Sequence, residues 1–108
     1  MSDDVLNRLA ATIRSRRLAG GESSYTSQLL EAGPEKCARK FGEEAVETVI
    51  AAISQSPTSL TAEAADVLYH LLVLLESRGV SFDDVLAELD RRSGTSGLEE
   101  KASRAARG

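Results

Sequence analysis

Two pairs of acidic residues have the spacing needed to bind one divalent cation. Glu44 and Glu47 lie three positions apart in one stretch of the chain, and Glu63 and Asp66 lie three positions apart in another. If both stretches are helical, the members of each pair share a helix face, with their Cβ atoms about 5 to 6 Å apart. Carboxylates suit Mg²⁺ or Mn²⁺, whose remaining coordination positions are filled by water and substrate phosphate.

The segment between the two pairs predicts how they meet. A turn near Pro57 would make the two helices antiparallel and place Glu47 level with Asp66, with Glu44 and Glu63 about one turn to either side. Four converging carboxylates repel one another and raise each other's pKa values unless a cation lies between them. The pattern therefore predicts a magnesium site, in which manganese can substitute.

A solvated acidic helix face is the alternative explanation, because paired exposed acids are common. The second pair argues against it. Glu63 and Asp66 are surrounded in sequence by apolar residues, namely Ala62, Ala64, Ala65, Val67 and Leu68. Ionised groups are rare in such surroundings unless they are paired or bound to a metal.

Other polar residues near the acids are suited to binding phosphate. Lys36 and Lys40 fall on the same helical stripe as Glu44, so phosphates and a cation would share one face. Ordinary ion pairing on the helix surface, of Lys40 with Glu44 in particular, also explains them. His70 lies four positions after Asp66 and therefore on the same side of its helix, where a substrate contact and a buried interfacial histidine both remain open.

Composition narrows the class of protein. A chain of 108 residues with two Phe, two Tyr and no Trp favours one all-α domain. The net charge of −4 argues against a general nucleic-acid binder. The single cysteine, Cys37, excludes an internal disulfide, and we interpret it as a buried core residue. Because no secretion signal or membrane-length apolar run stands out, we expect a cytoplasmic protein without membrane association.

Apolar periodicity and capping residues predict four helices. They are expected from Asp3 or Asp4 to about Leu18, ending at Gly20 and Gly21; from about Glu35 to Ile53; from Leu60, capped by Thr58 or Ser59, to about Arg78; and from Ser81 to about Arg92. Residues 22–27 are expected to form a loop beside the substrate, followed by a short helical turn through Leu29 and Leu30.

The apolar positions also predict how these helices pack. The second helix is expected to present one apolar stripe to the core, made of Ala38, Phe41, Ala45, Val49 and Ala52. The third is apolar around most of its circumference between Ala64 and Leu75, which predicts a central place in a bundle or at a subunit interface. Residues 1–92 are expected to form the domain, and residues 93–108 a flexible tail.

The same residues resemble a known family. Ser24-Tyr25-Thr26, Gly33-Pro34-Glu35-Lys36 and Lys40 precede the two acidic motifs, Glu43-Glu44-x-x-Glu47 and Glu63-x-x-Asp66. Their order and spacing resemble the MazG-type all-α nucleotide pyrophosphohydrolases, and more closely the phosphoribosyl-ATP pyrophosphatase family of histidine biosynthesis. The resemblance runs from about Leu6 to Arg92.

This resemblance implies a MazG-like four-helix bundle, completed by homodimerisation, that hydrolyses phosphoribosyl-ATP to phosphoribosyl-AMP and pyrophosphate. It implies Mg²⁺ ligands and phosphate-binding residues, namely Glu44, Glu47, Glu63 and Asp66 for the metal and Lys36 and Lys40 for the phosphates. Glu43 would support the ligands or position water, and Ser24, Tyr25 and Thr26 would contact the substrate. Our mechanistic hypothesis is magnesium-assisted attack of water on the α-phosphorus, with Glu47 or Glu44 as the base.

Two other functions fit the sequence. One is a housekeeping nucleotide pyrophosphohydrolase of the same superfamily, acting on damaged or excess triphosphates. The other is a non-enzymatic helical assembly module, in which the acids are only surface residues. A di-iron carboxylate bundle does not fit, because it needs a Glu-x-x-His motif on each of two helices and the chain has one histidine.

Overall fold

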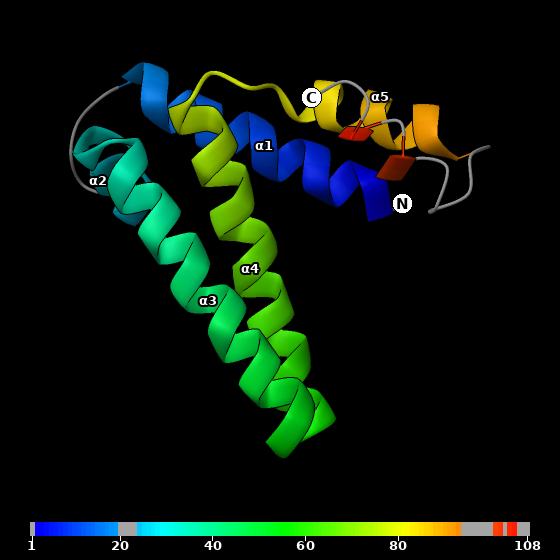
Figure 1. Cartoon of the computed structure of the whole chain (residues 1–108). Helices are drawn as coiled ribbons and strands as arrows, with labels where there is room; N and C mark the ends of the chain where they lie inside the picture. The colour runs from blue at the N-terminus through cyan, green and yellow to red at the C-terminus, as the bar shows by residue number, and fades with distance from the viewer. Residues whose placement is uncertain (1, 20–23, 94–100, 103, 106–108) are drawn as a thin grey trace.

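The computed structural model of the chain describes all residues except 1, 20–23, 94–100, 103 and 106–108. Five helices follow one another along the described chain: α1 (Ser2–Ala19), α2 (Tyr25–Ala32), α3 (Pro34–Ser54), α4 (Pro57–Ser77) and α5 (Phe82–Arg92) (Figure 1). The described residues form no strand, and the predicted all-α class is confirmed. The predicted helix stop at Gly20 and Gly21 lies outside the described residues, as does most of the predicted tail.

Three helix starts differ from those predicted, each for a local reason. Helix α1 begins at Ser2, so Asp3 and Asp4 lie inside it. Ser24 caps α2 through its hydroxyl, which accepts a hydrogen bond from the Ser27 amide, so part of the predicted loop is helical. Ser56 caps α4 in the same way, in place of Thr58 or Ser59. Pro57 therefore occupies the first turn of α4, where its missing N–H costs nothing.

The buried core lies where α1, α2, the start of α3 and the second half of α4 meet. Its buried apolar members are Ile13, Leu29, Cys37, Leu72 and Val73. The thiol of Cys37 donates a hydrogen bond to the Leu29 carbonyl, and burial raises the pKa of this thiol. Cys37 is thus a core residue, as predicted. The side chain of Arg17 pairs with Glu76 and joins the ends of α1 and α4 at the surface.

Helices α3 and α4 form a long antiparallel hairpin that extends away from α1 and α5 (Figure 1). The apolar stripe predicted for α3 is wrong in part, because Ala38, Val49 and Ala52 are exposed. The inner face of α3 instead includes Thr48, whose hydroxyl reaches the Glu63 carbonyl of α4, and the buried Ala51. Since α3 carries apolar residues on more than one face, periodicity alone left the inner face ambiguous.

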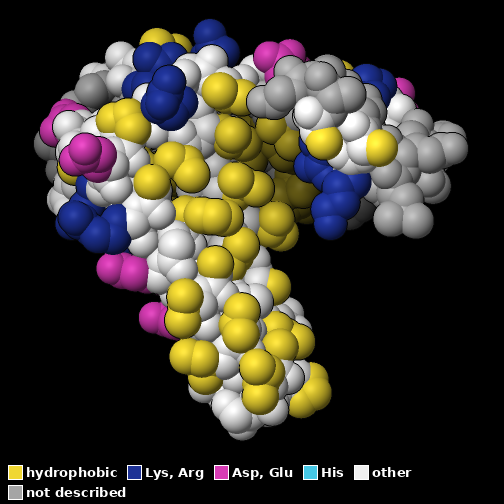
Figure 2. Space-filling model, viewed as in Figure 1, with side chains coloured by type: hydrophobic (Ala, Val, Ile, Leu, Met, Phe, Trp, Pro, Cys, Tyr) yellow, Lys and Arg dark blue, Asp and Glu magenta, His cyan; other side chains and the backbone are white. Residues whose placement is uncertain are grey.

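The outer faces of the hairpin carry many uncovered apolar side chains (Figure 2). The exposed set comprises Val46, Val49, Ile50 and Ile53 on α3 and Leu68 on α4. We call these five residues the apolar face. Helix α4 is also long and apolar enough to cross a membrane by length and composition alone, and 17% of its apolar window is buried within the described structure. Glu63 and Asp66 lie within this helix.

Helix α5 begins after a tight bend at Gly79, whose φ of +71° favours glycine. Ser81 caps the helix as predicted, and Phe82 packs against the core. Near the other end of α5, Arg91 and Arg92 both donate hydrogen bonds to Glu88 and lower the pKa of its carboxyl to about 2. The carboxylate of Glu88 is therefore stabilised by two cations.

Candidate active site

Three of the four predicted metal ligands lie together. Glu44 on α3 and Glu63 and Asp66 on α4 each offer a carboxylate oxygen, and these oxygens lie within 4.8 Å of one another. We call these three residues the acid cluster. Their convergence follows from the antiparallel hairpin, which turns the inner face of α3 toward the first half of α4.

Glu47 lies outside the acid cluster, although it remains near Glu63. The hydroxyl of Thr48 donates to the Glu44 carbonyl at 2.9 Å and lies 3.2 Å from the Glu63 carbonyl across the hairpin. Position 48 is therefore close to level with position 63, so the predicted alignment of Glu47 with Asp66 is shifted. The turn is shorter than predicted because α4 already begins at Pro57.

Glu63 has the most unusual environment of the acids. Its Oε1 atom is buried and has no hydrogen-bond partner within the described part of the chain. Burial raises the pKa of Glu63, and the neighbouring Glu47, Glu44 and Asp66 raise it further. A buried carboxylate oxygen without a hydrogen-bond partner is energetically costly. A hard divalent cation, which prefers oxygen ligands, would bind this atom together with the oxygens of the neighbouring acids. The residues present therefore fit such a cation.

The two lysines of the predicted phosphate-binding stripe differ in their surroundings. Lys40 donates a hydrogen bond to Glu43 at 3.1 Å, and this bond raises the pKa of Lys40. Lys40 therefore forms a surface ion pair, as one alternative predicted, but its partner is Glu43 and the predicted partner Glu44 is wrong. Lys36 is exposed and has no ion-pair partner among the residues that the structure describes. Glu43 is itself exposed, and its carboxylate holds the Lys40 ammonium through this ion pair.

The hydroxyls of Tyr25 and Thr26, two residues predicted to contact the substrate, bond to side chains of α4. The Tyr25 hydroxyl lies 3.4 Å from Nε2 of His70, and the Thr26 hydroxyl is hydrogen-bonded to that of Tyr69. Ser24 is engaged within α2 as its cap. His70 is buried, which agrees with the interfacial alternative considered for it. Tyr69 was not singled out from the sequence, although a polar aromatic residue inside an apolar helix was a signal.

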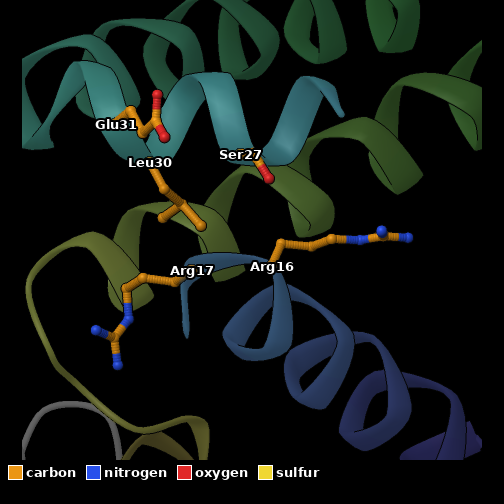
Figure 3. A pocket seen from close by; sticks show the side chains of 5 residues that line it. All are labelled: Arg16, Arg17, Ser27, Leu30 and Glu31. Carbon is orange, nitrogen blue, oxygen red and sulfur yellow. The ribbon is translucent and has the colours of Figure 1, made fainter. Parts of the chain in front are cut away.

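A small cavity of about 80 Å³ lies between α1 and α2 (Figure 3). Arg16, Arg17 and Ser27 are among its lining residues, and none of the acidic residues of the predicted metal site lines it. The two arginine side chains point in opposite directions (Figure 3). Arg17 pairs with Glu76, whereas no ion pair of Arg16 is found in the described ranges. The cavity is therefore separate from the acid cluster.

Comparison with known proteins decides the family. The model of the phosphoribosyl-ATP pyrophosphohydrolase family matches residues 6–93, a range that contains the acid cluster, both lysines and the Ser24–Thr26 segment. The chain belongs to this family. Its members are enzymes, so family membership excludes the alternative of a non-enzymatic assembly module.

Relatives that carry the pyrophosphatase name are similar to the chain over nearly their whole length. The phosphoribosyl-ATP pyrophosphatase of Rhodobacter capsulatus is 63% identical over 100 residues, which are 93% of this chain and 97% of the relative. The protein of the same name from Dinoroseobacter shibae is 61% identical over 100 residues, which are 93% of this chain and 98% of that relative. Phosphoribosyl-ATP pyrophosphatase 1 of Rhodopseudomonas palustris is 59% identical, over 96% and 97% respectively.

Proposed function

We propose that this enzyme hydrolyses phosphoribosyl-ATP to phosphoribosyl-AMP and pyrophosphate, the second step of histidine biosynthesis. The acid cluster carries the proposal, because the buried, unpaired Oε1 of Glu63 beside two further carboxylates favours a bound cation. Family membership supports the choice of substrate over the damaged or excess triphosphates of a housekeeping pyrophosphohydrolase.

Glu44, Glu63 and Asp66 would hold Mg²⁺, or Mn²⁺ in its place, and Glu47 lies close enough to share in the site. When bound, the cation would neutralise charge on the substrate phosphates and orient them. Magnesium usually keeps several water ligands and takes a few carboxylates from the protein. A cluster of three to four carboxylates on one hairpin suits that preference.

The residues of the chain would then carry out the hydrolysis. Glu47 or Glu44 accepts a proton from the attacking water, whose oxygen forms a bond to the α-phosphorus. The bond from this phosphorus to the oxygen bridging to the β-phosphate breaks, and pyrophosphate leaves with that oxygen. Lys36 and Lys40 offset the charge of the phosphates, and Glu43 keeps Lys40 in place through their hydrogen bond.

We further propose that the enzyme is a cytoplasmic homodimer and that its apolar face is covered by a second copy of the chain. Val49 is 56% exposed and Ile53 is 79% exposed. Contiguous exposed apolar side chains mark interaction surfaces in soluble proteins. A second hairpin on this face would complete a four-helix bundle.

Pyrophosphate release from phosphoribosyl-ATP, measured with and without magnesium, tests the proposed function. A panel containing ATP, dATP and dCTP should be run beside it, because a housekeeping enzyme would hydrolyse ordinary nucleotides comparably. We expect release that requires the divalent cation and a preference of at least about 100-fold in kcat/KM for phosphoribosyl-ATP. Comparable rates on all substrates would contradict the proposed substrate, and release in the presence of EDTA would contradict the metal.

A further inference from the structure

Within the described ranges, side-chain hydrogen bonds join the first turn of α2 to α4. Tyr25 and Thr26 are consecutive on α2, and their hydroxyls bond to His70 and Tyr69, which are consecutive on α4. His70 is buried, and Thr26 and Tyr69 are half-buried. Two bonds in register, made between residues more than 40 positions apart, define one orientation of α2 on α4.

The proton positions in this network follow from its acceptors. Nδ1 of His70 lies 2.9 Å from the backbone carbonyl of Asp66, and a carbonyl only accepts, so Nδ1 carries the hydrogen. In the neutral ring, Nε2 is then an acceptor, and the Tyr25 hydroxyl donates to it. His70 therefore links α2 directly to the backbone of Asp66, a member of the acid cluster.

Ring packing reinforces the same arrangement. The rings of Tyr69 and His70 meet edge to face, with centroids 4.9 Å apart and planes at 86°. The ring of Tyr25 stacks on that of Tyr69 with centroids 6.4 Å apart and planes at 21°. Tyr25 is nonetheless 50% exposed, and its hydroxyl is near enough to Lys40 to contribute to the raised pKa of that lysine. Half of Tyr25 is thus exposed near Lys40, while its hydroxyl and one side of its ring face α4.

We propose that Tyr69 and His70 are positioning residues, which hold the first turn of α2 so that the exposed part of the Tyr25 ring can stack on the adenine of the substrate. The inference rests on the proposed function for its substrate. The hydroxyls of Tyr25 and Thr26 face α4 and serve as anchors, so Thr26 affects binding through Tyr69 and makes no substrate contact of its own. Base stacking on aromatic rings suits an adenine and needs no further polar group.

A double-mutant cycle separates anchoring from direct contact. Thr26→Val and Tyr69→Phe each remove one hydroxyl of the same hydrogen bond, so each should lower kcat/KM for phosphoribosyl-ATP by about 5- to 10-fold, mainly through KM. The double variant should be no worse than the more severe single one, because the bond is lost only once. The matched control is Thr61→Val, which removes an exposed α4 hydroxyl bonded to the Pro57 carbonyl and should leave KM unchanged.

Two kinetic results and one exchange result would overturn the proposal. If Tyr69→Phe keeps the wild-type KM while Thr26→Val raises it, or if the two effects multiply in the double variant, Thr26 contacts the substrate itself. Amide hydrogen exchange gives a test that does not depend on turnover. Tyr69→Phe should speed the exchange of residues 25–28 at least 5-fold and leave residues 44–48 unchanged, and unaltered exchange at 25–28 would refute the anchor.

The experiment also distinguishes failure of the anchor from failure of the proposed function. Wild-type protein that releases no pyrophosphate from phosphoribosyl-ATP would refute the function, whatever the exchange data show. An active wild-type enzyme whose Tyr69→Phe variant matches it in both KM and exchange would refute the anchor alone. Tyr25→Phe removes only the hydroxyl, whereas Tyr25→Leu removes the hydroxyl and the aromatic ring. Tyr25→Leu should therefore raise KM more than Tyr25→Phe, and equal effects would contradict stacking.

Discussion

The two ends of the α3–α4 hairpin differ in how far other helices cover them. At one end, α1 and α2 cover α4, and residues such as Ile13 and Val73 are almost completely buried. At the other end, α3 and α4 are the only helices of the described chain that pack together, and their outer face is apolar and exposed. The inner face of this end includes the buried Ala51 and the buried Oε1 atom of Glu63.

This difference separates stability from chemistry. The covered end contains the largest fully buried side chains, Ile13, Val73 and Cys37, which stabilise the single chain. The open end contains groups that destabilise the single chain, namely mutually repelling acids and an uncovered apolar face. Both groups would be stabilised by a bound partner. A cation would compensate the first, and a second copy of the chain would compensate the second.

Glu63→Gln should have the largest effect on function. The substitution removes the charge of the buried carboxyl and leaves its shape, so we expect pyrophosphate release to fall by about 100- to 1,000-fold while helicity is retained. A Glu31→Gln variant, which changes an exposed acid on α2, should keep the wild-type rate. A Glu63→Gln enzyme with normal turnover would exclude Glu63 from the site.

Val49→Asp should disrupt assembly next. A buried, unpaired carboxylate in the centre of the apolar face should weaken the dimer by at least about 100-fold, as measured by sedimentation equilibrium. Val5→Asp is the matched control on α1, where Val5 is 54% exposed. If Val49→Asp sediments as the wild type does, the apolar face is not the interface.

Truncation of one isoleucine at each end compares the sources of stability. Ile13→Ala should lower the free energy of unfolding by about 2 to 4 kcal/mol at any protein concentration, because Ile13 is 1% exposed. Ile53→Ala should cost under about 0.5 kcal/mol in dilute protein and more as the concentration rises. Urea denaturation at two concentrations measures both, and equal, concentration-independent losses would remove the distinction.

In EDTA, Glu88 and Glu63 should affect the pH dependence of stability in opposite directions, and these effects should be smaller than those above. Arginines lower the pKa of Glu88 to about 2, so its contribution to stability is present above the usual value of 4.5 and is lost as pH falls through about 2. The pKa of Glu63 is raised by burial and its acidic neighbours, so its contribution is present at low pH and is lost as pH rises. At neutral pH, Glu88→Gln should therefore lower the melting temperature and Glu63→Gln should raise it. Shifts of the same sign would contradict this contrast.

The fold was predictable where local signals were strong. Ser81, the Gly79 bend and the long periodic segments predicted α3, α4 and α5 to within a few residues. The sequence also predicted Cys37 as a core residue, and it predicted that acids of two antiparallel helices converge. These features depend on capping, periodicity and helix geometry, which act over a few residues.

The errors have a common physical origin in tertiary context. Pro57 is compatible with both a turn and a helix start, and this ambiguity shifted Glu47 relative to Asp66. The apolar stripe of α3 was misplaced because its outer face is as hydrophobic as a core. The bonds of Tyr25 and Thr26 join residues more than 40 positions apart, and no spacing rule within one helix predicts them.

Manganese binding followed by electron paramagnetic resonance tests the central claim most directly, because free and bound Mn²⁺ are counted without turnover. We predict that the wild-type protein binds Mn²⁺, that Mg²⁺ competes for the same site, and that Glu63→Gln weakens binding by at least about 10-fold while Glu31→Gln does not. Undiminished Mn²⁺ binding by Glu63→Gln would show that the cation does not lie between the two helices.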